Sequence, residues 1–200
     1  MFKWKYKKYG LKIIDWLKSV STGPEGISID KMLLCASGLA GYACRQAVKA
    51  NREPVMVVAT KNNKNFYMGD AVNRYVLEDK YSVLSACNAF FENYAKVGED
   101  IPDVTEIVKK AVLGIGDESY RLWGLYEPAN IYCSVRKYWN EIYGEMIAPC
   151  CKKAEEMPVL FASVLQNIMA ISSQAAPARE LYCDALECVI FISKMDDDSI

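Results

Sequence analysis

Residues 32–48 read MLLCASGLAGYACRQAV, and this stretch predicts a central core helix that begins after Ser28 and ends near Asn51. Four alanines, spaced three or four residues apart, form one ridge of it. Gly38 and Gly41 leave a neighbouring face bare, at a cost of about 1 kcal/mol each relative to alanine. We therefore expect another element to pack closely on this face, although bare backbone also suits a ligand or a partner chain.

A β-hairpin is predicted directly after this helix. Residues 55–60, VMVVAT, form a β-branched run without alternation, which is typical of a strand covered on both faces. Residues 66–68, FYM, follow a turn at 61–64 whose two asparagines tolerate positive φ. This pattern predicts an antiparallel pair in which Thr60 faces Asn65.

The hairpin leads into a second helix. Asp70 follows Gly69 and is expected to cap a helix over residues 71–78, with Asn73 in its first turn. Polar residues at such a position are more often caps than catalysts, and we favour that interpretation. Asp70 and Asn73 are also candidate residues for a ligand or partner surface.

Three segments of the chain carry a resemblance: FYMGDAVNRYVLEDKYSV (66–83), GLAGYACRQAV (38–48) and ISKMD (192–196). Together they resemble a family of uncharacterised bacterial proteins with no assigned activity. The resemblance spans most of the chain and implies one domain over residues 1–200. It implies nothing about activity.

Composition and pattern favour one α+β domain that is mostly α-helical, with about seven or eight helices packed around a single β-hairpin. The chain has 200 residues and is 52% hydrophobic, which is enough for a sizeable core. Its 24 basic and 25 acidic residues are nearly balanced, so nothing indicates nucleic acid. No membrane-spanning run or signal peptide is evident, and we expect a cytoplasmic location.

The two ends of the chain differ in charge. Residues 1–18 form a basic amphipathic helix that carries six lysines against one aspartate, and residues 19–26 are a connection. We favour a helix that packs on its own domain over one that contacts a membrane surface or an acidic partner. The core is expected to span residues 27–195, and residues 196–200 form a solvated acidic tail.

Cysteine and histidine usage limits the possible chemistry. Histidine is absent, no CxxC motif occurs, and the eight cysteines mostly fall within apolar helical patterns. We therefore expect reduced core thiols, no metal site and no cofactor. Cys150 and Cys151 precede Lys152 and Lys153, whose charges favour a thiolate, so these two are candidate reactive thiols. The favoured interpretation is an ordinary helix end.

Residues 117–128 form an irregular connection that is unusually rich in aromatic residues. Tyr120, Trp123 and Tyr126 lie in it, and such a loop either covers a core or lines a site. We favour the cover, and we keep the three aromatic residues as candidates for a ligand or partner surface.

Two functional hypotheses remain. The leading one is a cytoplasmic binding or protein-interaction protein of the accessory or immunity type, for which no catalytic residue is nominated. The alternative is a small-molecule-binding protein or an enzyme that uses carboxylate or thiol chemistry, in a pocket between the 70–73 turn and the 117–128 loop. Because an isolated hairpin leaves open edges, we also expect a homodimer through or near residues 55–60 or 66–68.

Overall fold

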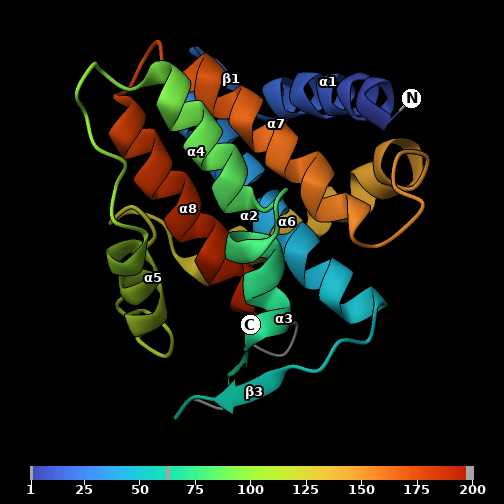
Figure 1. Ribbon diagram of the computed structural model, residues 1–200, viewed down its shortest axis with the longest axis vertical. Coiled ribbons are helices and arrows are strands. Elements are labelled where there is room, and N and C mark those ends of the chain that lie inside the picture. The colour runs from blue at the N-terminus through green and yellow to red at the C-terminus, as the bar shows by residue number, and fades with distance from the viewer. Residues whose placement is uncertain (1, 62–63, 197–200) are drawn as a thin grey trace.

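Helices make up most of the chain, and a small β-hairpin projects from one end of them (Figure 1). The structure is a computed structural model that describes residues 2–61 and 64–196. Two π-helical turns, Arg74–Glu78 and Tyr143–Ile147, extend α3 and α6. The described α-helices are α1 (Phe2–Val20), α2 (Ile29–Ala50), α3 (Asp70–Asn73), α4 (Val83–Tyr94), α5 (Val104–Leu113), α6 (Pro128–Ile142), α7 (Glu156–Ser172) and α8 (Ala178–Lys194). These elements confirm the predicted α+β, mostly α-helical class.

The strands form two antiparallel pairs. The larger pair is the predicted hairpin, β3 (Met56–Ala59) with β4 (Asn65–Met68). The smaller pair joins β1 (Thr22–Gly23) to β2 (Gly26–Ile27). This second pair lies at residues 22–27, across the end of the predicted connection (19–26), and was not expected from the sequence.

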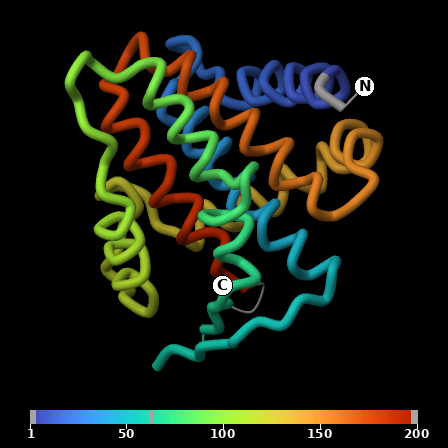
Figure 2. Tube along the Cα trace, viewed as in Figure 1, coloured from blue at the N-terminus to red at the C-terminus, as the bar shows by residue number. Residues whose placement is uncertain are grey.

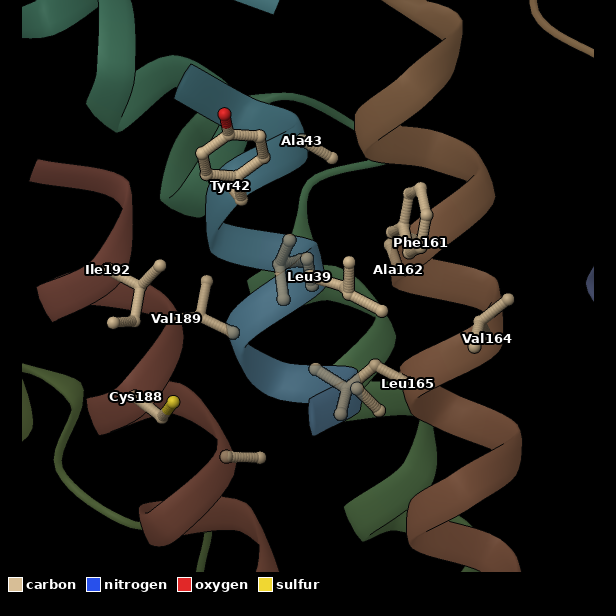
Figure 3. Close-up of a cluster of buried hydrophobic side chains, with 14 of the residues drawn as sticks. Leu39, Tyr42, Ala43, Phe161, Ala162, Val164, Leu165, Cys188, Val189 and Ile192 are labelled. Atoms are coloured by element: carbon tan, nitrogen blue, oxygen red, sulfur yellow. The ribbon is translucent and has the colours of Figure 1, made fainter. Parts of the chain in front are cut away.

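The core is built around α2, which lies between α7 and α8 (Figure 3). Small side chains along α2 allow both neighbours to approach, and larger side chains from α7 and α8 fill the space. Side chains of this buried cluster are Leu39, Tyr42 and Ala43 of α2, Phe161, Ala162, Val164 and Leu165 of α7, and Cys188, Val189 and Ile192 of α8.

The two glycines of α2 lie where other helices come closest. A Cβ atom on Gly41 would sit 2.6 Å from the Val189 carbonyl oxygen of α8. A Cβ atom on Gly38 would sit 2.5 Å from Cγ2 of Val135 on α6. The expected close packing is therefore confirmed, and neighbouring helices occupy the bare face that also suited a ligand.

α1 packs its apolar stripe on the rest of the bundle, as favoured from the sequence. Ile13 and Leu17 are fully buried, and α1 lies against α7 and α2. Lys8 and Lys12 remain exposed on the opposite side, and Lys7 is exposed at the edge of the stripe, beside α7. Within residues 2–61 and 64–196, no helix combines the length and the apolar character needed to cross a bilayer.

The hairpin register differs from the predicted one by one residue. Ala59 pairs with Asn65, whereas Thr60 donates its N–H to the Lys64 carbonyl at 2.9 Å. The connection therefore closes over three residues instead of four, and three-residue loops are common in hairpins. The asparagine turn predicted at residues 62–63 lies outside the described residues.

The predicted cover on both faces of the first strand is wrong. Met56, Val57 and Val58 are 61%, 52% and 37% exposed. Within the described chain β3 pairs only with β4, while β4 lies closer to the helices and bridges from Phe66 to Met195. Figure 2 shows the hairpin at the lower end of the molecule, below the helical bundle. A β-branched run suits an outer strand as well as a buried one, so composition alone did not separate the two.

The first residue of the predicted solvated acidic tail is not solvated. Asp196 is buried and accepts a hydrogen bond from Nη2 of Arg45 at 2.5 Å. Arg45 is itself only 1% exposed, so its charge needs a buried partner. The remaining residues of the tail lie outside the described ranges.

Candidate functional site

The aromatic loop between α5 and α6 covers α8. The Tyr120 ring stacks on Phe191 with centroids 5.1 Å apart and an interplanar angle of 11°. The Trp123 Nε1–H donates to the Asp184 carbonyl at 2.8 Å, and the Trp123 and Tyr126 rings meet edge to face. Trp123 and Tyr126 therefore contact each other, whereas Tyr120 packs separately on Phe191, and the three rings are largely used in contacts within the protein.

A buried carboxylate lies beneath this loop, and sequence reasoning missed it. Glu187 of α8 is 2% exposed, accepts a hydrogen bond from the Tyr120 hydroxyl and pairs with Lys110 Nζ at 2.7 Å. Burial and this carboxylate together raise the pKa of Tyr120. Burial, followed by the charges of Glu187 and Glu180, raises the pKa of Asp184 to about 6. An acidic residue every three or four positions along 180–187 was the available signal.

The other pair of predicted residues lies elsewhere. Gly69, with φ of 113°, occupies the N-cap position of α3, and Asp70 is exposed and makes no side-chain cap. The expected capping role of Asp70 is therefore wrong, because α3 begins one residue earlier. Asn73 accepts a hydrogen bond from Nζ of the buried Lys194 at 3.1 Å, and burial lowers the pKa of Lys194.

The two halves of the predicted surface do not form one pocket. Trp123 contacts α8 at Asp184 and Asn73 contacts it at Lys194, ten residues further, which is roughly 15 Å along a helix axis. A cleft beside Tyr120 is lined by the hairpin and the helix ends, and its volume is about 60 Å³. Small-molecule sites commonly measure roughly 300–1,000 Å³.

The paired cysteines are not activated by their neighbours. Cys150 is fully buried and Cys151 is partly buried, just after the π-helical turn Tyr143–Ile147. Burial is the largest influence on each thiol and raises both pKa values. Lys152 and Lys153 are exposed, and their backbone N–H groups donate to Glu156. The predicted lowering of the thiol pKa is therefore not what the structure shows.

Arg45 forms a second buried polar centre that sequence reasoning missed. Its guanidinium donates to the Tyr132 hydroxyl and to Asp196, both at 2.5 Å. The rings of Tyr42, Tyr67 and Tyr132 lie 5.2–5.9 Å from its Cζ atom. Arg45 thus links α2, α6, β4 and the end of α8. A lone arginine within an otherwise apolar helix was the signal for such a centre.

The open edge of β3 (Met56–Ala59) is the remaining candidate. It carries three large exposed aliphatic side chains on a strand whose outer side meets no other described strand. Unpaired strand edges with apolar side chains are uncommon in monomeric proteins, because such an edge can form backbone hydrogen bonds with a strand of another chain. No group of three or more potential metal-ligating side chains is positioned for a metal among the described residues.

Comparisons with known proteins returned no relative. No protein-family model, curated protein or solved structure matches this chain. The resemblance to uncharacterised bacterial proteins stays a prediction, and the functional argument depends on the geometry described above.

Proposed function

We propose that the chain is a protein-interaction protein of the accessory or immunity type that acts in the cytoplasm, and that it binds a second copy of itself along the open edge of β3. The observation that carries this proposal is the exposure of Met56, Val57 and Val58 on an edge strand. Burial of these side chains and pairing of the free backbone groups both favour association.

The hydrogen-bond pattern of the hairpin identifies which backbone groups are available. Thr60 donates to Lys64, and bonded and non-bonded pairs alternate along an antiparallel ladder. Val58 therefore pairs inward with Phe66, while Val57 and Ala59 direct their N–H and C=O groups away from β4. A two-fold axis at Val58 would place Val57 of each copy opposite Ala59 of the other, which permits four N–H···O bonds.

The dimer is expected to be weak. Only a four-residue strand and its exposed side chains enter the contact, which places the interface at the small end of the range for specific complexes. The extent of dimerisation should therefore depend on concentration. The eight free thiols, most of them buried or partly buried, are compatible with the reducing cytoplasm that the proposal assumes.

The enzyme alternative gains less support from the geometry. Its predicted residues contact separate parts of α8, and the cleft beside Tyr120 is far smaller than common ligand sites. Asp184 and Glu187 form the kind of carboxylate pair that an acid–base site uses. However, Glu187 already bonds to Tyr120 and Lys110, so it is not directed into an open pocket.

Light scattering over a concentration series tests the proposal. We expect the mass to rise from one chain of 22.5 kDa towards twice that value. Val57→Pro removes only an outward-facing N–H, which an edge strand tolerates, and Val57→Lys adds charge to the same edge. Both should stay monomeric with unchanged circular dichroism. Val97→Lys is the matched control, because Val97 is fully exposed in the loop after α4. A wild-type mass that stays at one chain, or dimers that persist in Val57→Pro, would refute the proposed interface.

A further inference from the structure

A groove of about 680 Å³ lies between α1 and α7. Its floor is apolar, because Ile14 and Val164 are buried and Gly10 brings the two helices close, with 3.7 Å between its Cβ position and Cγ2 of Val164. The residues that line it are Tyr6, Lys7, Gly10, Leu11, Ile14, Tyr81, Val159, Ser163, Val164 and Asn167. The groove shares no residue with β3, so its role is independent of the proposed dimer.

The charge around the groove is positive. Lys7 is the single charged residue of its lining and makes no ion pair with any described residue. Lys8 and Lys12 are exposed on the same helix. Among the nearby carboxylates, Glu156 pairs with Lys5 at 3.7 Å and Asp15 with Lys18 at 3.3 Å. Asp79 and Glu155 lie beyond the Tyr81 end of the groove and do not line it. An anion at Lys7 would therefore meet a net positive field.

The dimensions favour a small ligand over a protein partner. The volume lies within the roughly 300–1,000 Å³ that is typical of small-molecule sites, and the lining is mostly apolar with a few polar groups. The α1 wall runs from Lys7 to Ile14, roughly 10 Å along the helix axis, which gives room for an extended alkyl chain.

We propose that this groove binds an amphiphile of the fatty-acid class, with one unbranched alkyl chain and an anionic head group. The alkyl chain lies on Gly10, Ile14 and Val164, where it displaces water from apolar surface. Lys7 faces the anionic head. Trp4, which is 69% exposed, lies on the same helical face as Lys7 and Leu11, so its fluorescence reports on occupancy.

Calorimetric titration tests the proposal, with decanoate kept below its critical micelle concentration and decanol kept below its solubility limit. We expect one decanoate per chain, with decanol bound roughly two- to fivefold more weakly because it lacks the charge that pairs with Lys7. Lys7→Gln should reduce decanoate binding to the decanol level. Ser163→Phe fills the groove and should weaken both ligands at least tenfold. Lys137→Gln, on the exposed face of α6, is the matched control and should bind as the wild type does.

Three results would overturn the proposal. The first is a failure of decanoate binding to saturate, and the second is wild-type affinity in a folded Ser163→Phe variant. The third is capture of the protein by anionic phospholipid vesicles while monomeric decanoate does not bind, because the surface would then contact a bilayer instead of holding one chain. A blue shift of tryptophan emission with decanoate, absent in Trp4→Phe, would locate the ligand beside α1.

Discussion

Gly41→Ala tests how closely α2 and α8 approach each other. The new Cβ atom would lie 2.6 Å from the Val189 carbonyl oxygen and 3.1 Å from the Ser193 nitrogen, both backbone atoms. Backbone in the middle of a packed helix has no alternative rotamer, so α8 must retreat by roughly 0.8 Å to reach ordinary contact at 3.4 Å. That shift opens gaps along the whole α2–α8 contact.

Two opposing contributions set the free energy of unfolding of Gly41→Ala. Alanine favours the helix by about 1 kcal/mol relative to glycine, while overpacking in a core commonly costs about 1–3 kcal/mol. Gly10→Ala in α1 is the matched control, because its Cβ atom would meet only Val164 at an ordinary 3.7 Å. Gly10→Ala should therefore gain the helix propensity of alanine without the cost of overpacking. The two variants are expected to differ by about 1–3 kcal/mol in the free energy of unfolding, with Gly41→Ala the less stable.

Urea denaturation followed by circular dichroism measures this difference, provided that both variants keep the same dependence on denaturant. Thermal unfolding should agree, since about 1 kcal/mol shifts the melting temperature of a chain of this size by about 2–4 °C. Equal stabilities for Gly41→Ala and Gly10→Ala would refute the reasoning, because α8 would then lie farther from α2 than the structure places it.

Three further predictions concern the buried charges and the thiols. Arg45→Met leaves Asp196 buried without its cation and should lower the free energy of unfolding by about 3–5 kcal/mol in urea denaturation; a loss below about 1 kcal/mol would contradict the buried pair. Burial raises the pKa of Asp184 to about 6, so the folded state binds this proton more tightly than the unfolded state and stability should fall as pH rises from about 4 to 6. Asp184→Asn should therefore be more stable than the wild type at pH 7.5 but not at pH 4. If the stabilities of the two proteins change with pH in parallel, Asp184 is not the group responsible. A thiol reagent should label the exposed Cys133 of the folded protein quickly and the buried Cys87 only after denaturation, whereas equal rates would contradict the described packing.

Local sequence patterns predicted the N-terminal helix, the central helix and a mostly helical domain of about seven or eight helices. Ser28 and Ser82 cap α2 and α4 through the backbone N–H groups of Lys31 and Ser85, because a side-chain oxygen before a helix satisfies free donors wherever the helix lies. The glycines of α2 predicted close packing because their cost needs a compensating contact. Which helix supplies that contact could not be derived, since pairing between distant elements leaves no local signal.

The candidate site was harder to predict for the same physical reason. Arg45 and Asp196 are 151 residues apart, and no periodicity connects them. The exposed β3 strand has the composition of a buried strand. β-Branched residues favour the extended backbone of any strand, so they do not show whether the strand is buried. The aromatic loop at 117–128 was expected to cover the core, but only the structure shows that Tyr120 and Trp123 pack on α8.

Amide hydrogen exchange in β3, measured by NMR over a range of protein concentrations, tests the proposed interface most directly. Met56 and Val58 face β4 and should be protected at every concentration, whereas Val57 and Ala59 face outward and should exchange quickly when the protein is dilute. The account predicts that protection of Val57 and Ala59 rises with concentration, in step with the mass from light scattering. Fast exchange of these two amides at a concentration where the mass has doubled would show that the copies meet elsewhere, and would contradict the open edge of β3 as the interaction site.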